Sequence, residues 1–239
     1  MCTLTILRES GRVLVTMNRD DVATREEAPP QLWSNTDLEF IGPRDVQAGG
    51  TWIGVNRHGV IACLLNRYDN APKGARSRGG IVIEAMRGAS IEASVGVVSS
   101  LALEAYSPFT CIVIAQGGAV RLDWDGAHID RRVFATGQEI AMATSSSWRF
   151  DEVKAQRETL FRDLMSGSGD AAGKLATFHT RRVPGDDAWA PMMLRQHSQT
   201  KSVTQIELSH HGAQMRYWTR ESATARGLER PEQSIRIPR

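Results

Sequence analysis

The fold is decided by residues 1–21, which read MCTLTILRESGRVLVTMNRDD. Residues 3–7 alternate polar and apolar side chains, as a half-buried strand does, and residues 12–17 form a second run rich in β-branched side chains. The short polar segment between the two runs has the composition of a turn. The stretch therefore predicts an antiparallel hairpin, whose return strand brings residues 18–21 back beside Cys2.

Cys2 directly follows the initiator methionine, and a side chain this small permits removal of that methionine. The processed chain would carry a thiol and a free α-amine on the same residue. The unperturbed pKa of an α-amine is about 7.7–8.0, so part of it is an unprotonated base near neutral pH. A thiol is a strong nucleophile once it has lost its proton. Cys2 would then supply both a nucleophile and a base.

Four polar residues end this hairpin: Asn18, Arg19, Asp20 and Asp21. A carboxylate beside the N-terminus can hold an ammonium group, and an arginine or asparagine can orient a substrate or an oxyanion. An ordinary polar turn after a strand explains the same four residues. On these residues alone, the turn is the simpler interpretation.

A second hairpin is expected from residues 51–56 and 60–66, which follow Gly49-Gly50 and end at Asn66. A side-chain amide at the end of a buried strand can donate a hydrogen bond to a developing oxyanion. The alternative is a strand-terminal asparagine that hydrogen-bonds to its own turn.

Together these segments resemble the NRDE family, which includes the Transport and Golgi organisation protein 2 group and is similar to N-terminal nucleophile hydrolases. The resemblance covers the first third of the chain and rests on Met-Cys, two strands, Asn-Arg-Asp-Asp, Gly49-Gly50-Thr51-Trp52-Ile53-Gly54 and Leu65-Asn66. The motif here ends in Asp21, which is one methylene shorter than the glutamate of the family. The resemblance implies that Cys2 is the nucleophile, that Arg19 buttresses it, that Asp20 or Asp21 holds the α-amine, and that Asn66 stabilises an oxyanion.

The resemblance also implies residues that bind the substrate, namely Asn18, Arg78, Ser145, Ser146 and Arg195. Arg78 lies in a short basic motif similar to one in the family and would meet an anionic group, although a solvated loop arginine is the common alternative. The serines follow a predicted strand, where the family has a serine near the nucleophile and an oxyanion donor is expected. A helix-capping serine run is the alternative there.

The composition bounds the domain organisation and the class of partner. With 239 residues, 41% of them hydrophobic, the chain is long enough for one large domain or two small ones. We expect a single domain over residues 1–220 and a basic tail over residues 221–239. The net charge of +2, without a basic stripe, gives no reason to expect nucleic acid. The longest apolar run, residues 109–115, is too short to span a bilayer.

Cysteine usage and the N-terminus suggest a cytoplasmic protein without a metal or another cofactor. The three cysteines, Cys2, Cys63 and Cys111, do not have the spacing of a metal site, and the last two lie in apolar runs typical of buried thiols. The N-terminus lacks the layout of a signal peptide. We expect a small-molecule substrate or a hydrophobic ligand as the partner, while the oligomeric state stays open.

The remaining segments set the fold class. Prolines and polar residues over 22–45 predict an irregular surface segment. Helices are expected within residues 81–103, 151–165 and 171–179, and strands within 109–134, 140–144 and 201–218. Because the strands come in hairpins without βαβ alternation, antiparallel sheets covered by helices fit best. The resemblance implies an α+β, four-layer αββα sandwich like that of N-terminal nucleophile hydrolases.

Two function hypotheses of different classes follow. In the first, the protein is an N-terminal-cysteine hydrolase that cleaves a non-peptide amide bond through an acyl-thioester on Cys2. In the second, it is a non-catalytic carrier or trafficking protein for a hydrophobic or haem-like ligand, a role that the resemblance allows. A retained fold without chemistry is a weaker third possibility. The hydrolase explains the Cys2 and Asn-Arg-Asp-Asp arrangement, but the identity of the acyl group stays open.

Overall fold

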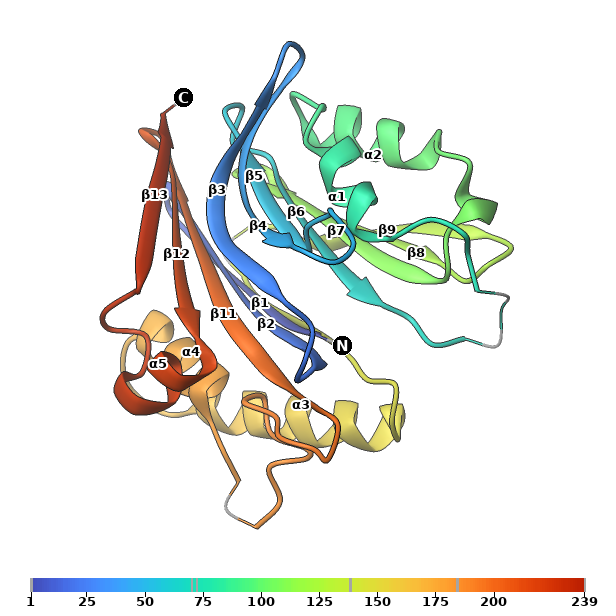
Figure 1. Ribbon diagram of the computed structural model, residues 1–239. Coiled ribbons are helices and arrows are strands. Elements are labelled where there is room, and N and C mark those ends of the chain that lie inside the picture. The colour runs from blue at the N-terminus through green and yellow to red at the C-terminus, as the bar shows by residue number, and fades with distance from the viewer. Residues whose placement is uncertain (1, 70, 72, 138, 184, 239) are drawn as a thin grey trace.

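Two antiparallel sheets stacked face to face form the centre of the computed structural model (Figure 1), which describes residues 2–69, 71, 73–137, 139–183 and 185–238. The six-stranded sheet has the order β10-β1-β2-β11-β12-β13. Its strands are β1 (Cys2–Glu9), β2 (Arg12–Val22), β10 (Ile140–Ser145), β11 (Ser198–Ser209), β12 (Gly212–Thr219) and β13 (Gln233–Pro238). The seven-stranded sheet keeps sequence order: β3 (Glu27–Asn35), β4 (Leu38–Asp45), β5 (Ile53–Asn56), β6 (Ile61–Asn66), β7 (Phe109–Ala115), β8 (Gly118–Trp124) and β9 (Ile129–Ala135).

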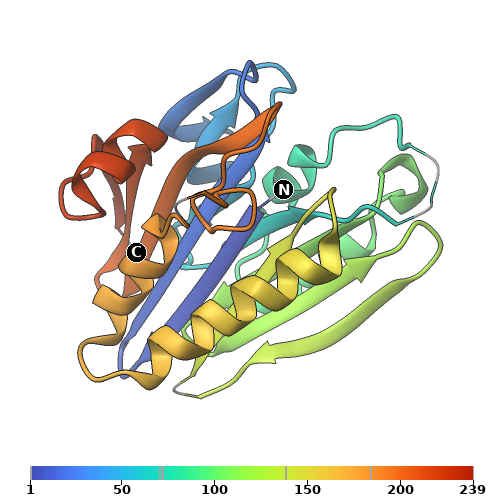
Figure 2. The same ribbon diagram turned by 90° about the horizontal axis from the view of Figure 1, so that it is seen from below.

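Helices cover the outer faces of both sheets, which gives the expected four-layer αββα arrangement (Figures 1 and 2). The helices α1 (Gly79–Ala85) and α2 (Ile91–Ser99) pack on the seven-stranded sheet. On the six-stranded sheet lie α3 (Phe150–Ser166), α4 (Ala171–Thr180) and α5 (Arg220–Arg226). Within the described ranges, no helix is long and apolar enough to cross a membrane.

The expected hairpins are confirmed, and the inward-facing apolar side chains of their strands form the core between the sheets. β1 pairs with β2 over residues 2–9 and 12–19, and β5 pairs with β6. Leu4 and Ile6 of β1 are fully buried against the second sheet, in the same apolar cluster as Cys2. Burial of such side chains contributes about 1.5–3 kcal/mol each. The hairpin is therefore held by its inward face, with Cys2 at the end of the core.

Two segments differ from the sequence-based expectation. Residues 22–45, expected to be irregular, contain β3 and β4; β3 lies at a sheet edge, and the register shift between Ala28 and Gln31 accommodates the intervening prolines. The expected basic tail after residue 220 instead forms α5 and β13, and β13 pairs with β12. Ile235 and Ile237 alternate with polar residues there and join the core, a short period-two pattern that the surrounding charges obscured.

The outward face of β1 and β2 is polar but buried beneath α3 and α4. Asn18 donates from its amide nitrogen to the carbonyl oxygens of His179 and Pro191, at 2.9 and 2.8 Å. Its amide oxygen therefore accepts from Nδ1–H of His179 at 2.6 Å, and Nε2 of that ring accepts from the Thr5 hydroxyl at 2.7 Å. Burial, and to a smaller extent the charge of Arg157, lowers the pKa of His179 to about 3. This histidine is a neutral structural link.

Arg157 of α3 ties the same layer together. It is 1% exposed and donates to the hydroxyls of Thr3 and Thr144, at 2.5 and 3.0 Å, and to the carbonyl oxygens of Trp189 and Ala190. Thr3 and Thr144 face each other across the β1–β10 pair. A single buried guanidinium thus fixes the pairing of these strands next to Cys2.

We predict that His179 makes folding sensitive to acid. The unfolded chain takes up a proton near pH 6.5, whereas the folded chain does not until about pH 3, so the free energy of unfolding must fall as the pH falls through this window. His179→Asn keeps a donor for Asn18 but removes the titration. Below pH 6.5 the wild type should lose stability more steeply than the variant, by up to about 1.4 kcal/mol per pH unit. Urea denaturation at a series of pH values measures both slopes, and equal slopes would contradict the prediction.

Candidate active site

Cys2 lies at the start of β1, between two strands that present polar residues to it. In the sheet register it faces Arg19 of β2 on one side and Ser145 of β10 on the other. Cys2 is 6% exposed and lines a cavity of about 440 Å³. Burial and the negative charge of Asp20 raise the pKa of the Cys2 thiol, while the backbone N–H of Asp20 and the charge of Arg19 oppose that rise. The thiol thus has two groups beside it that favour its thiolate form.

The backbone nitrogen of Cys2 has a defined partner, because it donates to the hydroxyl oxygen of Ser145 at 3.0 Å. We expected Ser145 near an oxyanion, but the structure directs its oxygen to the nitrogen that would become the α-amine. Ser145 also lines a second cavity. Met1, whose removal we predict, lies outside the described residues.

Arg19 is buried beside Cys2 and is held by three carboxylates. It lies 2.5 Å from Glu27, 3.1 Å from Asp21 and 3.2 Å from Asp45. Its guanidinium carbon also lies 4.4 Å from the centroid of the Trp52 ring. Burial alone would lower the pKa of Arg19, but the three carboxylates raise it above the ordinary value. The charge of Arg19 is therefore permanent and its side chain is fixed.

The Asn-Arg-Asp-Asp stretch belongs to β2 rather than to a turn, so its side chains alternate between two faces. Arg19 and Asp21 lie on the cavity side, where they pair with each other. Asp20 accepts from the Thr200 hydroxyl at 2.6 Å and lies 3.6 Å from Arg157, in the buried layer under the helices. Asn18 points into that layer too, so its position does not fit the expected contact with a substrate.

Asn66 ends β6, as expected, and lies where two cavities meet. It lines both the Cys2 cavity and a second one of about 470 Å³. Among the described residues its side-chain amide has no hydrogen-bond partner, which leaves the amide able to donate to a ligand. Within the described residues, Asn66 therefore does not form the side-chain hydrogen bond to its own turn that was the alternative interpretation.

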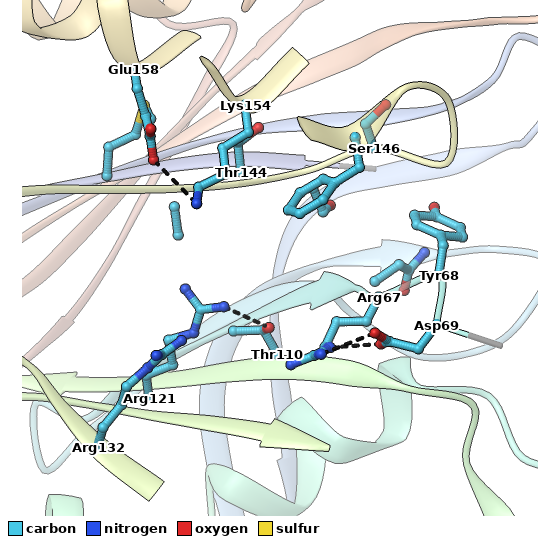
Figure 3. Close-up of a pocket in the computed structure, with 15 residues that line it drawn as sticks. Arg67, Tyr68, Asp69, Thr110, Arg121, Arg132, Thr144, Ser146, Lys154 and Glu158 are labelled. Atoms are coloured by element: carbon cyan, nitrogen blue, oxygen red, sulfur yellow. Dashed lines mark hydrogen bonds and ion pairs between the residues drawn. The ribbon is translucent and has the colours of Figure 1, made fainter. Parts of the chain in front are cut away.

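The second cavity lies between the two sheets, and Figure 3 shows its two walls. Thr144, Ser146 and Lys154 lie on one wall, and Arg67, Thr110 and Arg121 lie on the other (Figure 3). The buried Asp123 is 3.3 Å from Arg67, 2.7 Å from Arg121 and 2.8 Å from Arg132. The arginines of this cavity therefore share a carboxylate of their own.

Ser146 and Arg195 support a loop instead of lining the Cys2 cavity. The Ser146 hydroxyl donates to the Trp148 carbonyl oxygen at 2.6 Å and accepts from Nη1 of Arg195 at 3.3 Å. Arg195 also stacks on the Trp148 ring, 4.7 Å from its centroid. Ser146 borders the second cavity, while Arg195 lines neither, so the expected contact of Arg195 with a substrate does not fit its position.

Arg78 does line the Cys2 cavity. Its Nη1 donates to the carbonyl oxygens of Pro108 and Arg67, at 2.8 and 3.3 Å. Burial lowers the pKa of Arg78, and the negative charges of Cys2 and Asp21 act in the opposite direction. Of the residues expected from the sequence, the structure brings together Cys2, Arg19, Asp20, Asp21, Asn66, Arg78 and Ser145, although the carboxylate of Asp20 is held in the layer under the helices.

Sequence reasoning missed several residues that support this site. Asp45, Glu27, Arg157 and Thr200 come from four different elements, and no local motif singles them out. The alternation within β2 could have separated Arg19 and Asp21 from their neighbours, had the strand been extended past residue 17. Among the described residues, no group of three His, Cys, Asp or Glu side chains is placed to hold a metal ion.

Comparisons with solved structures show the same architecture. An N-acylethanolamine-hydrolyzing acid amidase ortholog from Caenorhabditis elegans superposes with a TM-score of 0.61 at 14% identity, covering 99% of this chain and 100% of that one. A variant of the conjugated bile acid hydrolase from Clostridium perfringens gives a TM-score of 0.52 at 11% identity, covering 100% and 97%. At such identities the likeness shows the fold, which is that of N-terminal nucleophile hydrolases.

Sequence comparison adds the family. The comparison with curated proteins found no match. The family model for Transport and Golgi organisation 2, however, matches residues 1–222, which include every candidate residue described above. The chain therefore belongs to the Transport and Golgi organisation 2 family.

Proposed function

We propose that the protein is an N-terminal-cysteine hydrolase that cleaves a non-peptide amide bond. The observation that carries this proposal is the position of Cys2, whose thiol lines a cavity and whose nitrogen is held by Ser145. The proposal has further support from the structural neighbours, which are named as an acid amidase and a bile acid hydrolase.

Removal of Met1 would turn the Cys2 nitrogen into an α-amine at the position that Ser145 already holds. The amine takes the thiol proton, and the thiolate attacks the carbonyl carbon of the substrate, forming a C–S bond. The carbonyl π electrons move to the oxygen, and Asn66 donates to the resulting oxyanion. When the C–N bond breaks, the leaving nitrogen receives the proton from the α-ammonium, and an acyl-thioester remains on Cys2.

Water completes the reaction. The α-amine, again unprotonated, takes a proton from a water molecule that attacks the thioester carbonyl. Collapse of this second tetrahedral intermediate breaks the C–S bond, and the thiolate regains its proton. The products are a carboxylic acid and the amine released in the first step.

The charged residues around Cys2 have supporting roles in this proposal. Arg19 favours the thiolate through its charge, and Glu27 and Asp45 keep its side chain in place. Asp21 pairs with Arg19 at the cavity wall, while Asp20 contributes its backbone N–H beside the thiol. Ser145 takes the amine-holding role that the sequence suggested for Asp20 or Asp21.

We predict that active protein lacks Met1. A retained methionine would convert the amine into an amide nitrogen, which is not a base. Intact-mass spectrometry of protein from its native host should show a chain that begins at Cys2. Activity in material that keeps Met1 would contradict the amine-as-base mechanism.

We predict that an electrophilic acyl probe labels Cys2 alone. Cys63 and Cys111 are fully buried, and burial raises the pKa of Cys63 well above its ordinary value and that of Cys111 to about 12. Mass spectrometry of the Met1-free protein should show one added acyl group, which Cys2→Ala removes and Cys111→Ala keeps. Cys2→Ala should abolish amide turnover, and Cys2→Ser should greatly reduce it.

The same experiment separates the hydrolase from a carrier. A carrier would turn over no acyl amide, would leave Cys2 unlabelled and would bind a hydrophobic ligand saturably. That combination in Met1-free protein would overturn the proposed function.

We predict that Asn66 acts in the transition state. Asn66→Ala should lower kcat by about 10²–10³-fold, the usual loss for one oxyanion donor, with little change in KM. Asn66→Asp is the matched variant, because it keeps the size of the side chain and replaces the donor with a negative charge. It should be at least as slow. Steady-state kinetics on an acyl-amide panel measures both, and an unchanged kcat would remove Asn66 from the mechanism.

A further inference from the structure

Three cations of the Cys2 cavity come from one segment between β6 and α1. Lys73, Arg76 and Arg78 all line the cavity of about 440 Å³ that contains the thiol. Within the part of the chain that the structure describes, none of the three forms an ion pair with a carboxylate. Among the described residues, this wall of the cavity therefore carries three cations without a carboxylate in direct contact, and Asp21 acts on Arg78 only through its charge at longer range.

The other cations near Cys2 have carboxylate partners. Arg19 contacts three carboxylates, and Arg25 lies 2.8 Å from Asp45. In the second cavity, Asp123 holds Arg121 and Arg132, as described above. Positive charge without a partner is thus concentrated on the segment 73–78 and is not a general property of the site.

This segment is anchored to the neighbouring chain at several points. The backbone nitrogen of Gly74 donates to the Ser107 hydroxyl at 2.9 Å, and that of Arg76 donates to the Ala105 carbonyl oxygen at 2.9 Å. A Cβ added at Gly74 would lie 2.3 Å from the backbone nitrogen of Ser107, so only glycine permits this close approach. With the contact of Arg78 to Pro108, these links hold the cations at the cavity wall.

Leaving a half-buried guanidinium without a counter-charge costs free energy. Burial accordingly lowers the pKa of Arg78, the opposite of the shift at Arg19. A ligand anion would supply the missing counter-charge, and guanidinium groups match the planar geometry of carboxylate and the oxygens of phosphate or phosphonate.

We propose that Lys73, Arg76 and Arg78 form an anion subsite, so that the substrate is an acyl amide with an anionic group close to its scissile C–N bond. This inference deepens the proposed function and rests on it for the identification of the ligand as a substrate. The presence of the subsite is independent of any chemistry at Cys2 and is testable by binding alone.

Three probes that differ only in one group test the subsite. N-hexanoylglycine carries a carboxylate, N-hexanoylaminomethylphosphonate carries a phosphonate, and N-hexanoylglycinamide is a neutral isostere of the first. Isothermal titration calorimetry with the Cys2→Ala variant measures binding without turnover. Both anions should bind at least about tenfold more tightly than the neutral amide, as charge-assisted hydrogen bonds require. Their order identifies the preferred anion.

Substitutions test which residues cause the preference for anionic ligands. Arg78→Gln, placed in the Cys2→Ala background, should weaken anion binding by about tenfold or more. Arg76→Gln should weaken it by about two- to fivefold, as for an exposed charge, and leave the neutral amide unaffected. Arg132→Gln is the matched control, because it removes one positive charge from the neighbouring cavity, where Asp123 already compensates it. It should change anion binding by less than about twofold.

The inference is overturned if the anions bind no more tightly than the neutral amide, or if Arg132→Gln weakens them as much as Arg78→Gln does. Turnover by the Met1-free wild type distinguishes the two proposals. Anion preference in binding without hydrolysis of any probe would remove the proposed function and keep the subsite. Hydrolysis with equal kcat/KM for charged and neutral amides would keep the enzyme and remove the subsite.

Discussion

The buried guanidinium of Arg157 holds together the strands that carry the candidate site. It contacts Thr3, Thr144 and Asp20. These three residues are the chain neighbours of Cys2, Ser145 and Arg19, which lie side by side in the sheet. Burial lowers the pKa of Arg157, while the charge of Asp20 opposes this effect. Breaking a buried ion pair by removing one partner typically costs about 3–5 kcal/mol, so the layer beneath α3 and α4 is a stringent constraint on the geometry above it.

Two charge systems therefore lie on opposite faces of the same sheet. Beneath α3 and α4, Thr5, Asn18 and His179 hydrogen-bond to one another and His179 stays neutral, so this layer is structural. On the cavity face, Arg19 contacts three carboxylates, whereas the cations of the segment 73–78 form no ion pair within the described residues. A protein that neutralises one wall of a cavity and leaves the other charged is suited to orienting a polar ligand.

Local pattern was enough to predict the hairpins, the helices α3 and α4, and the end of β6 at Asn66, because each depends on neighbours within a few residues. It failed for residues 22–45, where edge position and a register shift allow prolines in a strand, and for β13, whose pattern is short. The strand-like course of residues 18–21 was also missed, because their polarity is typical of a turn.

The candidate site was predictable only in part for a related reason. Cys2 and Asn66 were singled out by their places in the chain, and the resemblance added Arg19, Asp20, Asp21 and Arg78; all six line one cavity. The contact between the Cys2 nitrogen and Ser145 joins residues 143 positions apart, and its geometry depends on the register of β1 with β10. The partners of Asn18 and Asp20 depend on how α4 and β11 pack, which no short motif encodes.

The alternation along β2 has a consequence for how this protein can vary over evolution. Because one strand supplies a charged residue to the cavity and the next residue to the helix-covered layer, its length between residues 12 and 19 is as constrained as its composition. A single deletion there would place Arg19 on the face covered by the helices and Asp20 on the cavity face beside the thiol. A substitution in this strand therefore changes the residues of one face only, whereas an insertion or deletion would change the residues on both faces at once.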